Sequence, residues 1–248
     1  MTFSTQVSDL STALVRLPTD QRQVAIVHCE GHFAGLDGKT AHGLVRHCDA
    51  FEIRAVVDSH SAGLDAGMVL DGVANGIPIV TDLAAALALA GPRADTFIYG
   101  MAPANGLFRP EDRQALLEAM ASGLNLVSGM REFLSDDAEF AATAHRQKVW
   151  IRDVRRPAAL KDLRLFDGSI ARAHCLRIAV LGTDGAIGKR TTATLLVKAL
   201  RNHGIHAVLV NTGQTGLIQG GRFGIPLDAI PSQFCSGAVE GAVVEAFE

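Results

Sequence analysis

The sequence lacks the marks of several classes of protein. Its net charge is only −3 over 248 residues, so no basic excess indicates binding to nucleic acid or to an anionic membrane surface. No apolar run approaches the ~20 residues that a membrane-spanning helix requires. The N-terminus carries Ser, Thr, Gln and Asp where a signal peptide would have a basic start and an apolar core. We therefore expect neither nucleic acid nor a membrane among the partners of this protein.

Cysteine is scarce, and its spacing is uninformative for metals or disulfides. The four cysteines are thinly spread, and no two of them form a C-x-x-C pair. Reduced thiols are the simplest interpretation, and they favour a cytoplasmic location. The nine histidines give no pair with the spacing of zinc ligands on one helix face, so we expect no metal site.

Apolar residues and glycine, in contrast, are plentiful. Hydrophobic residues make up 48% of the chain, which is enough to bury a sizeable core. Short β-rich runs alternate with longer helical ones from residue 24 onward, as is typical of a parallel sheet covered by helices on both faces. The predicted strands are 24–29, 51–58, 77–80, 95–99, 124–127 and 149–151, and the predicted helices between them are 38–47, 64–73, 82–89, 110–122 and 136–146.

The charged stretch 153–175 interrupts this alternation, and a second α/β unit follows it. We expect a Rossmann-like doubly wound domain at 1–152, an interdomain connection at 153–175 and a P-loop NTPase-like domain at 176–248. The second domain would contain strands at 176–181 and 206–210 and a helix from about residue 236 to the end. A P-loop sheet needs at least one further strand, so we expect the C-terminal part of this domain to be missing or supplied by a second chain.

The most informative segment is the glycine-rich turn at 182–192, which lies between a predicted strand and a predicted helix. Backbone N–H groups and a helix N-terminus make such a turn a phosphate cradle, and the lysine reaches a terminal phosphate. Two positions depart from the strict P-loop pattern: Thr183 replaces a glycine, and Arg190 replaces the Ser or Thr that would bind Mg²⁺. The predicted phosphate-binding residues are Gly182, Thr183, Gly185, Gly188, Lys189, Arg190, Thr191 and Thr192.

Polar side chains also follow other predicted strands. After strand 206–210 the chain offers small donors that would lie beside the P-loop, and we predict that they bind substrate, together with one later arginine. These residues are Asn211, Thr212, Gly213, Gln214, Thr215 and Arg222. In the first domain, several segments would line one edge of the sheet and form either a second anion site or plain tight turns. They are 30–40, Asp58, 99–106 and 128–132.

Taken together, the motifs resemble those of the D-glutamate N-acetyltransferase family over nearly the whole chain. The shared marks are the Gly-Lys-Thr-Ala turn at 38–41, the strand ending in Asp58, the loop at 100–103, the segments 127–129 and 153–155, the glycine-rich turn at 182–192 and the loop at 211–216. The glycine spacing of the turn also resembles that of dethiobiotin synthetase.

The resemblance implies an acyltransferase that moves an acetyl group from acetyl-CoA to the amine of D-glutamate, with the P-loop holding the phosphates of CoA. For this chemistry we expect Arg190 and Arg222 to bind the carboxylates and Asp184 or Asp228 to act as the catalytic base. We also expect the protein to form a homo-oligomer. Two alternatives stay open. One is an ATP- and Mg²⁺-dependent ligase or kinase of the dethiobiotin synthetase type, and the other is a non-catalytic protein that binds CoA or a nucleotide.

Overall fold

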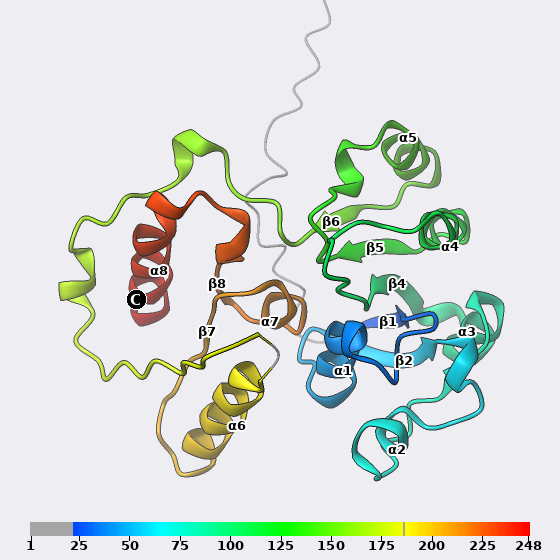
Figure 1. Ribbon diagram of the computed structural model, residues 1–248, viewed down its shortest axis with the longest axis horizontal. Helices are drawn as coiled ribbons and strands as arrows, with labels where there is room; N and C mark the ends of the chain where they lie inside the picture. Colours follow the sequence, from blue (N-terminus) through cyan, green and yellow to red (C-terminus); the bar gives the residue numbers. More distant parts are fainter. Residues whose placement is uncertain (1–21, 186) are drawn as a thin grey trace, which may run out of the picture.

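A computed structural model of the protein describes residues 22–185 and 187–248 (Figure 1). The first 21 residues of the predicted first domain and position 186 of the glycine-rich turn lie outside the described residues. The chain has the predicted α/β architecture, with a six-stranded parallel sheet in its N-terminal half.

The sheet has the strand order β3-β2-β1-β4-β5-β6, and every neighbouring pair is parallel. The strands are β1 Gln23–His28, β2 Phe51–Val57, β3 Ile79–Val80, β4 Ala94–Tyr99, β5 Asn125–Ser128 and β6 Ile151–Asp153. All six predicted strands of this half are confirmed. The order reverses between β1 and β4, and ligands of open α/β sheets bind at the carboxyl ends of the strands where the order reverses.

Five helices cover the two faces of the sheet, as predicted. They are α1 Lys39–Arg46, α2 Ala66–Asp71, α3 Leu83–Ala90, α4 Pro110–Ala121 and α5 Ala138–Gln147. In Figure 1, α3, α4 and α5 follow one side of the sheet, and α1 and α2 follow the other. Asp65, Asp82 and Asp137 begin α2, α3 and α5, because their side chains accept hydrogen bonds from otherwise free N–H groups of the first turn.

The C-terminal half differs more from the prediction. It contains α6 Lys189–Asn202, β7 Val210–Asn211, α7 Gln214–Ile218, β8 Phe223–Gly224 and α8 Ser232–Phe247. The helices after the glycine-rich turn and at the C-terminal end are confirmed, but of the predicted strand 206–210 only Val210 is in a strand, the two-residue β7. The short helix α7 begins within the predicted loop 211–216.

The predicted strand at 176–181 is wrong, since this segment is irregular in the structure. The side chains of Leu176, Ile178 and Leu181 are 88%, 58% and 85% exposed. A strand requires a neighbour to satisfy its backbone N–H and C=O groups, and the described residues place no strand beside this segment. Apolar composition alone therefore did not suffice to form the strand.

The two halves meet where α7 packs against α1 (Figure 1). The side-chain amide of Gln219 donates hydrogen bonds to the carbonyl oxygens of Gly43, at 2.7 Å, and His47, at 2.6 Å. The backbone carbonyl of Gln219 accepts hydrogen bonds from Asp49 and Ala50. One residue of the second half thus holds the C-terminal end of α1 and the turn that follows it.

This contact yields a first prediction. Replacing Gln219 with alanine removes two hydrogen bonds: the His47 carbonyl loses this donor, whereas the Gly43 carbonyl keeps the N–H of His47. We expect the free energy of unfolding to fall by about 1–2 kcal/mol. Thermal unfolding followed by circular dichroism measures the change. The control is Gln114→Ala, because Gln114 lies exposed on α4 and bonds only to Glu118. Equal melting temperatures for the two variants would contradict the role of Gln219.

No helix within the described residues is both long enough and apolar enough to cross a membrane. In the same part of the chain, no three His, Cys, Asp or Glu side chains gather closely enough to hold a metal ion.

Candidate functional site

The glycine-rich turn leads into α6 in a conformation that leaves the N-terminus of this helix open. Gly188 begins the helix with a φ of +93°, a value that only glycine adopts readily, and among the described residues no side chain caps the first turn. The first N–H groups of an α-helix have no acceptor within the helix, so they face outward here. The partial positive charge of these N–H groups would favour an anion at this end of α6.

Lys189 folds back across the same turn. Its Nζ atom donates a hydrogen bond to the backbone carbonyl of Asp184. A side chain at Gly182 would collide with this lysine, because a Cβ atom there would lie 2.9 Å from Lys189 Cδ. The Asp184 carboxylate accepts a 2.6 Å hydrogen bond from the N–H of Gly185. The loop thus holds one ammonium group next to the open helix end, and Thr183 lies exposed beside it.

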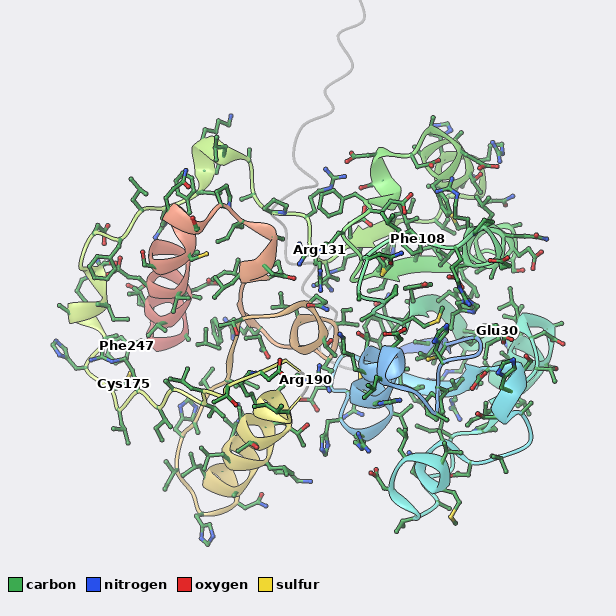
Figure 2. The ribbon with its side chains drawn as sticks, viewed as in Figure 1. Glu30, Phe108, Arg131, Cys175, Arg190 and Phe247 are labelled. Atoms are coloured by element: carbon green, nitrogen blue, oxygen red, sulfur yellow. The ribbon has the colours of Figure 1, made fainter. Side chains whose placement is uncertain are left out.

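Arg190, the next residue, points away from the turn and toward the first half of the protein (Figure 2). A Cβ atom on Gly43 of α1 would lie 2.7 Å from Arg190 Nη2, so glycine makes room for the guanidinium. Burial lowers the pKa of Arg190, and the nearby charge of Arg46 lowers it further. The structure therefore separates Arg190 from Lys189, while Thr191 and Thr192 stay exposed on the first turn of α6.

The predicted substrate loop serves mainly to join the two halves. Gln214 is buried, and its Cγ atom would lie 2.8 Å from a Cβ atom built on Gly129 after β5. The hydroxyl of Thr215 lies 3.2 Å from the hydroxyl of Thr40 in α1, in a buried hydrogen bond. Both side chains thus lie buried at the contact with the first half.

The other residues of this loop divide between buried and exposed positions. Asn211 is buried, and its side-chain amide donates a 3.4 Å hydrogen bond to the carbonyl of Phe223. Thr212 is exposed, and Gly213 precedes α7 in extended conformation. The guanidinium of Arg222 stacks over the ring of Phe223, 5.0 Å from its centroid. Of this set, only Thr212 and Arg222 present exposed side chains to solvent.

A cavity of about 220 Å³ lies at the carboxyl ends of β4 and β5 and at the start of α1. The loop after β4, the turn after β5 and the segment after β6 line it, so it lies near the reversal of strand order where α/β sheets bind ligands. Its charged lining residues are Lys39, Arg131, Arg155 and Asp228. Asp228 belongs to the C-terminal half, so both halves contribute to this cavity. Arg131, one of its lining residues, is labelled in Figure 2.

The charged groups of the cavity are unevenly paired. Asp228 Oδ2 accepts a 3.0 Å hydrogen bond from Arg131 Nη2 and lies 3.0 Å from Arg155 Nη1. The Nε atom of Arg155 is buried and has no hydrogen-bond partner among the described residues. Burial lowers the pKa of Arg155, Asp228 opposes this effect, and Arg131 adds to it. One carboxylate thus serves two guanidinium groups, and an N–H group remains unpaired.

Asp228 was predicted as a site residue, and Arg131 lies in the segment 128–132 that was predicted to line this edge, but neither Arg131 nor Arg155 was assigned a role. Arg131 and Arg155 each follow the end of a strand, β5 and β6, which is where functional side chains of such sheets gather. Their position after a strand could have identified them. The segments 99–106 and 128–132 do line one edge, as expected, together with Lys39 of the segment 30–40.

Asp58, by contrast, serves a tight turn. Its buried carboxylate accepts hydrogen bonds from the N–H groups of Gly31, at 2.8 Å, and His60, at 3.2 Å. Nearby, Glu30 accepts hydrogen bonds from the backbone and hydroxyl of Ser59. Of the two interpretations for 30–40 and Asp58, the structure thus favours a turn for this part of the edge.

A buried network of polar side chains borders a second, smaller cavity of about 140 Å³. Asp112 in α4 accepts hydrogen bonds from Tyr99, at 2.9 Å, from Arg109, at 2.8 and 2.9 Å, and from His28, at 3.2 Å. Burial by itself would raise the pKa of Asp112, but these three donors together bring it well below its ordinary value. The carboxylate is therefore ionised, and it anchors side chains from β1, β4 and α4.

Two family descriptions match this chain. Residues 59–157 match the Rossmann-like domain of unknown function DUF1611_N, and residues 164–248 match the P-loop domain of unknown function DUF1611_C. The crystal structure of a DUF1611 family protein from Anabaena variabilis ATCC 29413 superposes with a TM-score of 0.82 at 31% identity. That match covers 91% of this chain and 63% of the Anabaena chain.

Two related sequences carry the name D-glutamate N-acetyltransferase. The one from Tritonibacter scottomollicae is 33% identical over 147 residues, which are 59% of this chain and 43% of the relative. The one from Pseudoalteromonas sp is 28% identical over 155 residues, which are 62% of this chain and 45% of the relative. The matched part spans less than half of either relative. Because the chain matches both the Rossmann-like and the P-loop domain of DUF1611, it belongs to the DUF1611 family.

Proposed function

We propose that this protein is an N-acetyltransferase that moves an acetyl group from acetyl-CoA to the amine of D-glutamate or a similar amino acid. The observation that carries the proposal is the open N-terminus of α6 with Lys189 folded over the glycine-rich turn, because this arrangement suits a phosphate group. The name shared by the two relatives supports the acetyl transfer and the acceptor.

Each part of the turn has a role in this proposal. The free N–H groups of α6 and the ammonium of Lys189 would bind the phosphate oxygens of CoA. Lys189 would then exchange its hydrogen bond to the Asp184 carbonyl for one to a phosphate. Thr191 and Thr192, exposed on the first turn of α6, would add hydroxyl donors.

Acetyl-CoA would supply an activated thioester, and the amino acid would supply the attacking nitrogen. A new bond joins this nitrogen to the acetyl carbon, and the thiol of CoA leaves. The ammonium of the acceptor must first lose a proton to a base. Asp184 and Asp228 remain the proposed bases, and they differ in surroundings. Asp184 accepts one backbone hydrogen bond on an exposed loop, whereas two guanidinium groups hold Asp228.

The ATP-dependent alternative has less support from the structure. Phosphoryl transfer at a P-loop uses a Ser or Thr hydroxyl after the lysine to bind Mg²⁺. This position holds Arg190, and its guanidinium lies against Gly43 instead of over the turn. The arrangement suits a loop that holds a phosphorylated carrier without cleaving it.

Isothermal titration calorimetry with acetyl-CoA, CoA and ATP distinguishes the proposed acetyltransferase from the ATP-dependent alternative. We expect acetyl-CoA and CoA to bind with similar affinity, and ATP with Mg²⁺ to bind at least 10-fold more weakly. Both CoA ligands share the phosphates that the cradle would hold, which is why the acetyl group should matter little. Mg²⁺-dependent binding of ATP in the absence of CoA binding would overturn the proposal in favour of a ligase or kinase.

A further inference from the structure

We propose that the cavity lined by Lys39, Arg131, Arg155 and Asp228 binds a carboxylate of the acceptor, and that Asp228 occupies the place of this carboxylate in the free protein. The inference deepens the proposed function and rests on it for the identity of the acceptor. It assigns carboxylate binding to residues other than Arg190 and Arg222.

The charge of the cavity calls for an anion. Three cationic side chains face a single carboxylate, which leaves an excess of two positive charges. Arg155 is only 13% exposed, and its Nε–H is buried without an acceptor among the described residues. Buried N–H groups of charged side chains are normally paired, since leaving them unpaired is costly. The charge of Arg155 is therefore incompletely compensated, which favours a further anion in the cavity.

The geometry favours a carboxylate over a phosphate. Guanidinium groups present pairs of N–H donors in a plane, and these match the two oxygens of a carboxylate. A carboxylate already lies at this place in the free protein, because Asp228 Oδ2 is 3.0 Å from both Arg131 Nη2 and Arg155 Nη1. A phosphate would instead suit the open N-terminus of α6.

Asp228 is placed to exchange with a ligand. It lies on the short 3-10 helix Leu227–Ala229, and its side chain is 41% exposed, so it can turn outward without opening the core. A ligand carboxylate that displaces it would take over the two guanidinium groups. The freed Asp228 would then lie next to the ligand as an acceptor for the ammonium of an amino acid. Carboxylate and amine would thus be recognised at one place.

The test is calorimetric titration with glutarate, which has two carboxylates but no amine, and with D-glutamate. We expect Arg155→Lys to weaken glutarate binding about 10-fold, because lysine keeps the charge but loses the paired donors. The control is Arg156→Lys, since the adjacent Arg156 pairs with Asp136 away from the cavity and should change binding less than 2-fold. Arg131→Lys, at a 55% exposed position, gives the same test if Arg155→Lys does not fold.

Asp228→Asn provides the sharper result. Removing the competing carboxylate should strengthen glutarate binding several-fold and abolish the preference for D-glutamate over glutarate. Unchanged glutarate affinity in Arg155→Lys and Arg131→Lys, weaker glutarate binding in Asp228→Asn, or displacement of glutarate by inorganic phosphate would each overturn the proposal. These titrations require no acetyl donor. Normal glutarate binding without acetyl transfer would therefore count against the proposed function and leave the cavity assignment intact.

Discussion

Replacing Lys189 with alanine is expected to weaken acetyl-CoA binding about 10- to 100-fold, because a hydrogen bond to a charged group contributes about 1.5–3 kcal/mol. The variant removes the ammonium that the turn holds beside the open end of α6. The N–H groups of the helix remain, so residual binding should persist. Isothermal titration with acetyl-CoA measures the loss.

Lys198→Ala is the matched control, because Lys198 lies exposed on the same helix, more than two turns from the cradle. It should bind acetyl-CoA as the wild type does. Increasing salt should weaken binding to the wild type more than to Lys189→Ala, since the variant has one charge pair fewer to screen. Equal affinities for Lys189→Ala and Lys198→Ala would exclude the turn as the site of the donor phosphates.

Replacing Asp112 with asparagine is expected to lower the free energy of unfolding by about 3 kcal/mol, or roughly 6–12 °C in melting temperature. Asparagine has the same shape but lacks the negative charge that balances Arg109. It also lacks one of the two carboxylate oxygens that accept hydrogen bonds from Tyr99 and His28. The Arg109 side chain is 44% exposed, so water can replace part of the lost pairing, and the loss should stay at the lower end for a buried ion pair. Glu111→Gln, at the exposed neighbouring position, should change stability by only a few tenths of a kcal/mol.

The pH dependence of stability follows from the same carboxylate. Because the folded pKa of Asp112 lies below its value of about 3.9 in the unfolded chain, its stabilisation is complete above pH ~4. The stabilisation is lost as the pH falls from there through the folded pKa. Asp112→Asn should therefore lose less stability than the wild type on acidification below pH 4. Parallel acid-unfolding curves for the two proteins would show that the network does not hold this carboxylate ionised.

The sequence predicted the first half of the fold well and the second half less well, for a physical reason. The central strands β1 and β4 contain buried apolar runs, and every strand of the first sheet pairs with neighbours within the same half. The apolar segment 176–181 has the composition of such a strand, but strand formation depends on a partner that composition does not specify. The helix α6 formed nevertheless, because its hydrogen bonds are local.

The candidate site, too, could be predicted only where its residues are close together in the sequence. The predicted phosphate cradle consists of consecutive residues, so the pattern at 182–192 was enough to predict it. The cavity at the carboxyl ends of β4 and β5 brings together Lys39, Arg131, Arg155 and Asp228, which are far apart in the chain, so only the fold shows that they are neighbours. The direction of Arg190 was equally hidden, since it depends on the space that Gly43 leaves on a distant helix.

The most direct test of the account is the formation of N-acetyl-D-glutamate from D-glutamate and acetyl-CoA, followed by mass spectrometry together with release of the CoA thiol. We predict product and thiol in equal amounts for the wild type and for Lys198→Ala, and a rate reduced at least 10-fold for Lys189→Ala at low acetyl-CoA. A wild-type protein that binds acetyl-CoA but forms no acetylated D-glutamate or related amino acid would contradict the proposed transfer. That result would leave a protein that binds CoA without catalysis.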